Sequence, residues 1–178
     1  FLGRLHARKG LQLLLPAFAG ALKHVPEARL LVAGPDEGML AALTAQARDL
    51  ALGERVLFTG LLTGPDRLAA LAAADLFALP AVGEGFSMAV LEALACGLPV
   101  LLTPGCHFPE AAEAGTGVVV PREVEPLRAA LATLLSDADQ RAAMGRAARD
   151  LVAARYTWSQ IVAQMEAAYA AVIARKRR

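Results

Sequence analysis

Residues 80–100, PAVGEGFSMAVLEALACGLPV, decide the fold expected for this chain. They follow an apolar run, Leu76–Leu79, and begin with a loop that contains two glycines. A helix-compatible segment then runs from about Ser87 to Cys96. Ser87 can cap the first turn of this helix, and Gly97 is placed for the left-handed conformation that ends many helices. The pattern therefore predicts a strand, a loop and a helix in succession.

Two glutamates of this segment can converge on one ligand. Glu84 lies in the loop and Glu92 lies about one and a half turns into the helix, where its side chain leans back toward the loop. The free N–H groups at the helix start, with Gly85 beside them, form an anion site, and a carboxylate behind them can accept two hydrogen bonds from a vicinal diol. A phosphate at the start of the helix and a ribose at the carboxylate behind it would together match a sugar nucleotide. Two glutamates alone are more often a solvated loop acid and an exposed helix residue.

Positive charge comes from the start of the chain. Phe1 to Gly10 indicates a strand end, a turn at Gly3 and cations before the next helix. Arg4 and Lys9 would supply the charge that a diphosphate needs when no metal is bound, Arg4 as a planar fork and Lys9 as a point charge.

Apolar and helix-like segments alternate at intervals of about twenty to twenty-five residues, the spacing of βα units in a parallel sheet. The strands are short and apolar, as expected when helices cover both faces. We expect six strands, at Phe1–Leu5, Arg29–Ala33, Arg55–Thr59, Leu76–Leu79, Pro99–Leu102 and Thr116–Val120. We expect helices between them at Leu11–His24, Met39–Leu52, Pro65–Ala73, Ser87–Cys96 and Phe108–Ala114, and Pro16 should kink the first helix or delay its start. The predicted fold class is α/β, a Rossmann-like three-layer αβα sandwich with a six-stranded parallel sheet.

Ligands of open parallel sheets collect at the carboxyl ends of the strands. This rule places five loops on one edge, at residues 3–9, 34–38, 60–64, 80–86 and 103–109. Every candidate binding residue falls on this edge.

Composition limits the other function classes. The chain has 178 residues, enough for one domain with a substantial core, and no apolar run approaches the roughly 20 residues that span a bilayer. A net charge of +1 argues against a nucleic-acid binder. Two cysteines make no disulfide framework, so a reduced, cytoplasmic setting is expected. The charged tail, residues 175–178, is expected to be a solvated terminus rather than a membrane contact.

The pair Asp137 and Asp139 has a spacing that some metal-dependent transferases use. Asp137 stands three residues before Gln140 and ahead of a helical pattern, so a capping box explains it better. No metal site is predicted. Beyond it, Tyr156, Trp158 and Tyr169 are expected to be packing anchors.

Four groups of residues resemble one known family. They are Gly3-Arg4-Leu-x-x-x-Lys9-Gly10, Val56-x-Phe58-x-Gly60, Ala74-Asp75 with Pro80, and Glu84-Gly-Phe86 with Glu92 and Gly97-x-Pro-Val. In this order, and over nearly the whole chain, they resemble the nucleotide-binding half of GT-B glycosyltransferases in the large retaining group called family 4.

The resemblance implies a metal-independent, hexosyltransferase-type glycosyltransferase with a nucleotide diphosphate sugar as substrate and no other cofactor. Arg4 and Lys9 would hold the diphosphate and stabilise the leaving nucleotide, Glu84 would bind hydroxyls of the transferred sugar, and Glu92 would bind the ribose. The other implied substrate-binding residues are Gly3, Leu62, Gly85, Phe86 and Ser87.

The resemblance also implies a domain organisation. Residues 1–178 would be the C-terminal donor-binding domain, with 155–178 a helix that crosses back to an N-terminal acceptor domain. Because the chain begins inside an expected strand, we expect an excised domain that binds nucleotide weakly and transfers nothing. Peripheral membrane association of the full-length enzyme is left open.

Several questions stay open at the level of sequence. Asp36 and Glu37 could contact ligand, although a tight surface turn explains them too. Cys106 and His107 are adjacent without a third orienting group, so a structural loop near the donor sugar is preferred to a catalytic pair, with His107 or a backbone amide lining the pocket. Donor sugar, base, acceptor and linkage are not determined.

Two alternative functions remain. A sugar-nucleotide epimerase of the same fold would need acid and base groups, for which only Glu84 and His107 are candidates. A degenerate interaction domain would have no need for Arg4, Lys9, Glu84 and Glu92 together.

Overall fold

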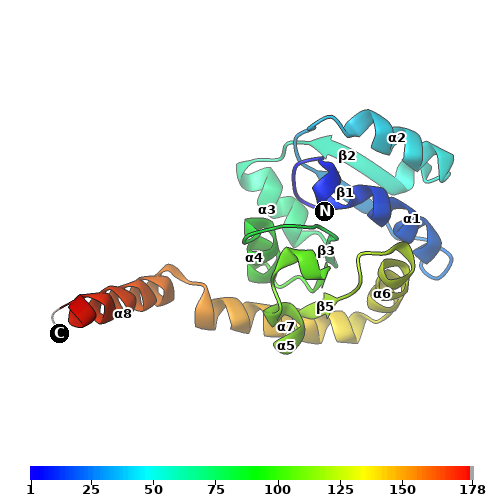
Figure 1. Cartoon of the computed structure of the whole chain (residues 1–178). Helices are drawn as coiled ribbons and strands as arrows, with labels where there is room; N and C mark the ends of the chain where they lie inside the picture. The colour runs from blue at the N-terminus through cyan, green and yellow to red at the C-terminus, as the bar shows by residue number, and fades with distance from the viewer. Residues whose placement is uncertain (177–178) are drawn as a thin grey trace.

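Short apolar segments form five parallel strands in the computed structural model, which describes residues 1–176 (Figure 1). The strands are β1 (Leu30–Ala33), β2 (Val56–Gly60), β3 (Phe77–Leu79), β4 (Val100–Leu102) and β5 (Gly117–Val119). Each lies within one residue of its predicted bounds. They form two sheets, β1-β2 and β3-β4-β5, so the prediction of one six-stranded sheet is wrong.

The sixth predicted strand, Phe1–Leu5, makes only two isolated parallel bridges, one to Ala33 and one to Asp36. Its backbone turns at Arg4, whose carbonyl accepts a hydrogen bond from the N–H of His6 at 2.9 Å. Within residues 1–176, no strand pairing joins this segment to β3. The opening segment therefore pairs only with β1 and the loop after it, and it does not join the two sheets.

A pocket of about 560 Å³ is lined by residues from both sheets. Its mostly apolar lining includes residues of β1, such as Leu31, and of β3, such as Phe77, together with Phe1. The backbone nitrogen of Phe1 donates a hydrogen bond to the Leu31 carbonyl at 2.9 Å.

Neighbouring residues of β3 and β4 belong to different cores. Ala78 and Leu101 pack with helices α1 (Leu11–Ala21), α2 (Leu40–Asp49) and α6 (Val124–Ser136). Phe77, Leu79 and Val100 pack with α3 (Gly64–Ala72), α4 (Met88–Ala95), α5 (Glu110–Glu113) and α7 (Ala138–Arg155). Because successive strand side chains point to opposite faces, helices cover both faces of the sheet, as predicted for an αβα sandwich.

Pro16 does not delay the first helix, since α1 begins at Leu11 and continues through it. Pro16 has no N–H for the carbonyl of Gln12, four residues earlier. The side chain of Gln46 on α2 takes this place, donating from Nε2 to the Gln12 carbonyl at 3.0 Å.

Two predicted helix ends are confirmed. The Asp137 carboxylate accepts a hydrogen bond from the N–H of Gln140 at 2.8 Å at the start of α7, which confirms Asp137 as the N-cap. The second bond of the predicted capping box does not form, because the Asp137 N–H donates to the Thr133 carbonyl instead. Gly97, which follows the C-cap residue Cys96 of α4, has φ +78°. Ser87 stands at the N-cap of α4, but its side chain makes no capping bond.

The last helix, α8 (Trp158–Lys176), extends away from the other elements (Figure 1). Trp158 is 85% exposed and Tyr169 is 61% exposed, so within this chain they are not packing anchors, because no other element reaches them. Tyr156 does pack, with its ring centroid 5.9 Å from that of Phe86 and 5.8 Å from that of Phe108.

Within residues 1–176, no helix has the length and the apolar character that a membrane span requires. The last two residues of the charged tail, 177 and 178, lie outside the described residues.

Candidate functional site

Lys9 and Glu84, predicted to share a ligand, lie in direct contact. Lys9 ends a short 3-10 helix, η1 (Ala7–Lys9), and Glu84 lies in the loop after β3. The Lys9 Nζ is 2.7 Å from Glu84 Oε1, and each side chain is only 15% exposed. Water screens this ion pair weakly. The structure thus places one predicted cation and one predicted acid on the carboxyl edge of the strands.

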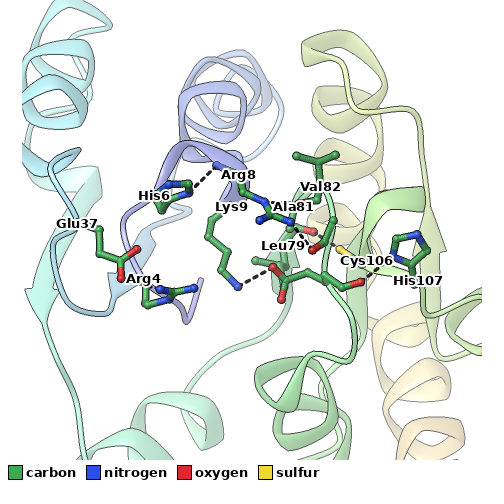
Figure 2. A network of polar contacts seen from close by, with 12 residues as sticks. Arg4, His6, Arg8, Lys9, Glu37, Leu79, Ala81, Val82, Cys106 and His107 are labelled. Carbon is green, nitrogen blue, oxygen red and sulfur yellow. Dashed lines mark hydrogen bonds and ion pairs between the residues drawn. The ribbon is translucent and has the colours of Figure 1, made fainter.

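Arg4 points toward a different acid. Its Nη1 lies 2.7 Å from Oε1 of Glu37, in the loop after β1, and the two side chains are 63% and 34% exposed. Figure 2 shows Arg4 directed to Glu37, while Lys9 extends from the same opening segment toward the loop after β3. An ion pair this exposed is weak, so the guanidinium can exchange this partner for a ligand.

Asp36 has a structural role next to Glu37. Its Oδ1 accepts hydrogen bonds from the N–H groups of Met39 and Leu40, both at 2.9 Å, at the start of α2. These bonds, that of Leu40 first, lower the pKa of the Asp36 carboxyl. The contacts favour the tight-turn interpretation for Asp36 and show Glu37 as the partner of Arg4.

Glu92 is paired with a residue that the sequence did not indicate. The Nη2 of Arg67, on α3, is 3.0 Å from Glu92 Oε1 on α4. Arg67 lies in a helical pattern with no motif around it, so only its position early in the helix after β2 could have drawn attention to it. The structure does not bring Glu84 and Glu92 into contact, and each acid has a cation of its own.

Backbone contacts hold the loop that carries Glu84. The N–H of Val82 donates to the Arg8 carbonyl at 2.8 Å, and Arg8 Nη2 donates to the Gly83 carbonyl at 2.7 Å. Arg122 Nε donates to the Pro80 carbonyl at 3.0 Å. The opening segment and the loop after β3 therefore form one unit, which fixes the distance between Lys9 and Glu84.

Cys106 and His107 belong to this scaffold. The buried Cys106 Sγ donates to the Leu79 carbonyl at 3.1 Å, and His107 Nδ1 lies 2.6 Å from the Glu84 carbonyl (Figure 2). Because a carbonyl only accepts, Nδ1 of His107 carries a proton. His107 has φ +48°, a left-handed conformation that few side chains adopt. The two residues bind different carbonyls, which favours the structural loop over a catalytic Cys–His pair.

The start of α4 offers unused donors. The N–H groups of Gly85, Phe86 and Ser87 make no hydrogen bond to other residues of the described range 1–176. Phe86 is half exposed and packs on Phe108 at 5.9 Å and on Tyr156. Desolvation, followed by the charge of Glu110, raises the pKa of Tyr156. The free N–H groups of Gly85, Phe86 and Ser87 could bind an anion next to Glu84.

The two remaining predicted residues are Gly3 and Leu62. A side chain on Gly3 would lie 3.8 Å from Lys9 Cε, so Gly3 belongs to the same site. Leu62, in the loop after β2, is half-buried. Over residues 1–176, no three His, Cys, Asp or Glu side chains are grouped to hold a metal ion.

Comparison with known proteins gives a consistent family assignment. Residues 1–151 match a family model described as glycosyl transferases group 1. The chain is 37% identical over 163 residues to a GDP-mannose-dependent monoacylated alpha-(1-6)-phosphatidylinositol monomannoside mannosyltransferase from Corynebacterium glutamicum. That match covers 87% of this chain and 42% of the relative, so the chain spans less than half of its length.

Solved structures share the fold. Sucrose-phosphate synthase from Thermosynechococcus elongatus superposes with a TM-score of 0.80 at 29% identity, covering 97% of this chain and 45% of that one. The C-terminal domain of a glycosyl transferase group 1 family protein, LpcC, from Francisella tularensis superposes with a TM-score of 0.79 at 25% identity. In this second case the match covers 89% of this chain and 84% of the other.

Proposed function

This chain belongs to the glycosyl transferases group 1 family, and from that premise we propose that it is the donor-binding domain of a retaining glycosyltransferase. The enzyme would move a sugar from a nucleotide diphosphate sugar to an acceptor, without a metal ion. The C. glutamicum relative is, by its name, GDP-mannose-dependent, which supports a nucleotide sugar as donor. The relatives reported above are transferases, and the epimerase and interaction-domain alternatives gain no support.

The contact between Lys9 and Glu84 is the observation that carries this proposal. It joins, at 2.7 Å, a cation suited to a diphosphate and an acid suited to sugar hydroxyls. Lys9 and the exposed Arg4 would bind the two phosphates and stabilise the charge that develops on the departing nucleotide. Lys9 is paired with Glu84 and Arg4 with Glu37, so a bound diphosphate would share these cations with the two carboxylates or displace them.

The remaining contacts follow from the positions of the loops. Glu84 would bind hydroxyls of the transferred sugar and orient its anomeric carbon. The free amides of Gly85, Phe86 and Ser87 would add donors for phosphate oxygens at the start of α4. Glu92 would accept the ribose hydroxyls, and the loop with Leu62 would pack against the base. Gly3 leaves room beside Lys9.

The domain organisation is part of the same proposal. The superposition with the isolated C-terminal domain of LpcC supports residues 1–178 as a single C-terminal domain. An exposed apolar stripe on α8 follows a heptad-like spacing, Trp158, Val162, Met165, Tyr169 and Val172. We assign this stripe to contact with an N-terminal acceptor domain of a longer protein. The cytoplasmic setting expected from the two cysteines, and peripheral association with a membrane, remain expectations.

Thermal-shift measurements with UDP, GDP, ADP and their sugar conjugates test the proposal. A ligand that binds only the folded chain raises Tm with the logarithm of its concentration over Kd. We expect at least one nucleotide to raise Tm, Lys9→Ala to abolish the shift, and Asp139→Ala, at an exposed position of α7, to leave it unchanged. If no nucleoside diphosphate shifts Tm, the donor-site proposal is wrong. If the 178-residue chain alone transfers sugar at full rate, the domain assignment is wrong.

A further inference from the structure

Arg67 is a cation that the proposed donor site does not yet use. It lies on α3, which follows β2 of the two-stranded sheet, whereas its partner Glu92 lies on α4, which follows β3 of the other sheet. The 3.0 Å contact between Arg67 Nη2 and Glu92 Oε1 therefore connects the helices of the two sheets. Both side chains are partly buried.

Two atoms of this pair are buried without a partner in the described structure. They are Nε of Arg67 and Oε2 of Glu92. Buried polar atoms in folded proteins nearly always have a hydrogen-bond partner. Oε2 is a strong acceptor that the protein encloses, so a ligand hydroxyl would satisfy it after a movement of the Glu92 side chain that exposes this oxygen beside α4.

Charge gives Arg67 a second role. A carboxylate close to a diphosphate repels it, and the repulsion is stronger where water is partly excluded. Glu84 is neutralised by Lys9, and Glu37 by Arg4. Arg67 does the same for Glu92, while occupying only one of its two oxygens.

We infer that Arg67 is a positioning residue for the ribose of the bound nucleotide. It holds the Glu92 carboxylate by Oε1, neutralises its charge, and leaves Oε2 to accept a hydrogen bond from a ribose hydroxyl. This inference rests on the proposed function. Because Arg67 acts through Glu92, its contribution requires both that acid and a ligand that carries the diol.

Calorimetry on the 178-residue chain tests this with two ligands, the best binder among UDP, GDP and ADP and its 2′,3′-dideoxy counterpart. We expect Arg67→Ala to weaken the ribonucleotide about tenfold. The same change should leave the dideoxy affinity unchanged, and Arg67→Lys should restore part of the loss. In a Glu92→Gln background, Arg67→Ala should add nothing.

Arg48→Ala is the matched control, because Arg48 pairs with Asp49 in an exposed contact on α2. Unliganded Tm values of all variants separate an effect on binding from unfolding. Equal losses for both ligands, or no loss, would overturn the inference. If nucleotide binding depends on Lys9 but is unchanged by Arg67→Ala, the inference about Arg67 is wrong and the proposed function stands. If the chain binds no nucleotide, the proposed function is wrong as well.

Discussion

Acidic residues at the carboxyl edge of the strands each have a defined partner. Asp36 binds backbone N–H groups, Glu37 binds Arg4, Glu84 binds Lys9 and Glu92 binds Arg67. These contacts hold the unliganded side chains in place. The stabilising effect of such a contact is most easily tested at Asp36, because its hydrogen bonds have a structural role.

Asp36→Ala should lower the Tm of the chain near neutral pH, because the two hydrogen bonds from the N–H groups of Met39 and Leu40 at the start of α2 are lost. The pKa of this carboxyl is lowered in the folded state, so its stabilising effect is present above the unfolded value of 3.8. The effect is lost as pH falls through the folded pKa. Thermal melts should therefore show a larger Tm difference between wild type and variant at pH 7 than at pH 2. Asp139→Ala serves as the control, and an equal Tm deficit at both pH values would contradict this account.

The elements around the site are joined by close backbone contacts. Gly10, between η1 and α1, has φ +81°, and a side chain there would clash with the carbonyl oxygen of Pro80. The start of α1 thus lies directly against the loop that carries Glu84. Position 10 requires glycine because its backbone is left-handed and because a Cβ atom there would clash with Pro80.

Gly10→Ala should destabilise the chain by at least about 2 kcal/mol, because strain and the clash add. Gly115→Ala is the matched control, since Gly115 has φ +65° with no atom within 4 Å of the added carbon. It should show the strain alone and cost about 1 kcal/mol. Urea unfolding measures both values. Equal losses of unfolding free energy for the two variants would show that the clash with Pro80 does not add to the cost of the backbone strain.

The whole molecule consists of a body with two cores and a helix, α8, that extends from it (Figure 1). The large side chains of the α8 stripe are exposed, so α8 buries little apolar surface within this chain. Stability of the body should therefore not depend on it.

Deletion of residues 157–178 should change the Tm of the body by less than about 2 °C, since surface segments with few buried contacts contribute little. The same deletion should leave any nucleotide-induced shift intact, because Arg4, Lys9 and Glu84 lie elsewhere. Differential scanning calorimetry of both chains provides the measurement. A decrease of more than about 5 °C would mean that α8 packs against the body in solution.

Local patterns predicted most of the elements and part of the site. The apolar segments predicted five strands, Asp137 as an N-cap predicted the start of α7, and Gly97 predicted the end of α4. These signals depend on a few consecutive residues and on backbone sterics, so they can be recognised in the sequence before the tertiary structure is known. The meeting of Lys9 and Glu84 followed from one further rule, that parallel strands bring their carboxyl ends to one edge.

Only the tertiary structure revealed the partners. The pairing of Glu92 with Arg67 and of Arg4 with Glu37, the Gln46 contact with the carbonyl freed by Pro16, and the division into two sheets depend on how helices and loops pack. Such contacts join residues far apart in the chain, and several competing partners would satisfy the same charge or hydrogen-bonding group. The choice among them is made by packing geometry over the whole domain, which no short stretch of sequence contains.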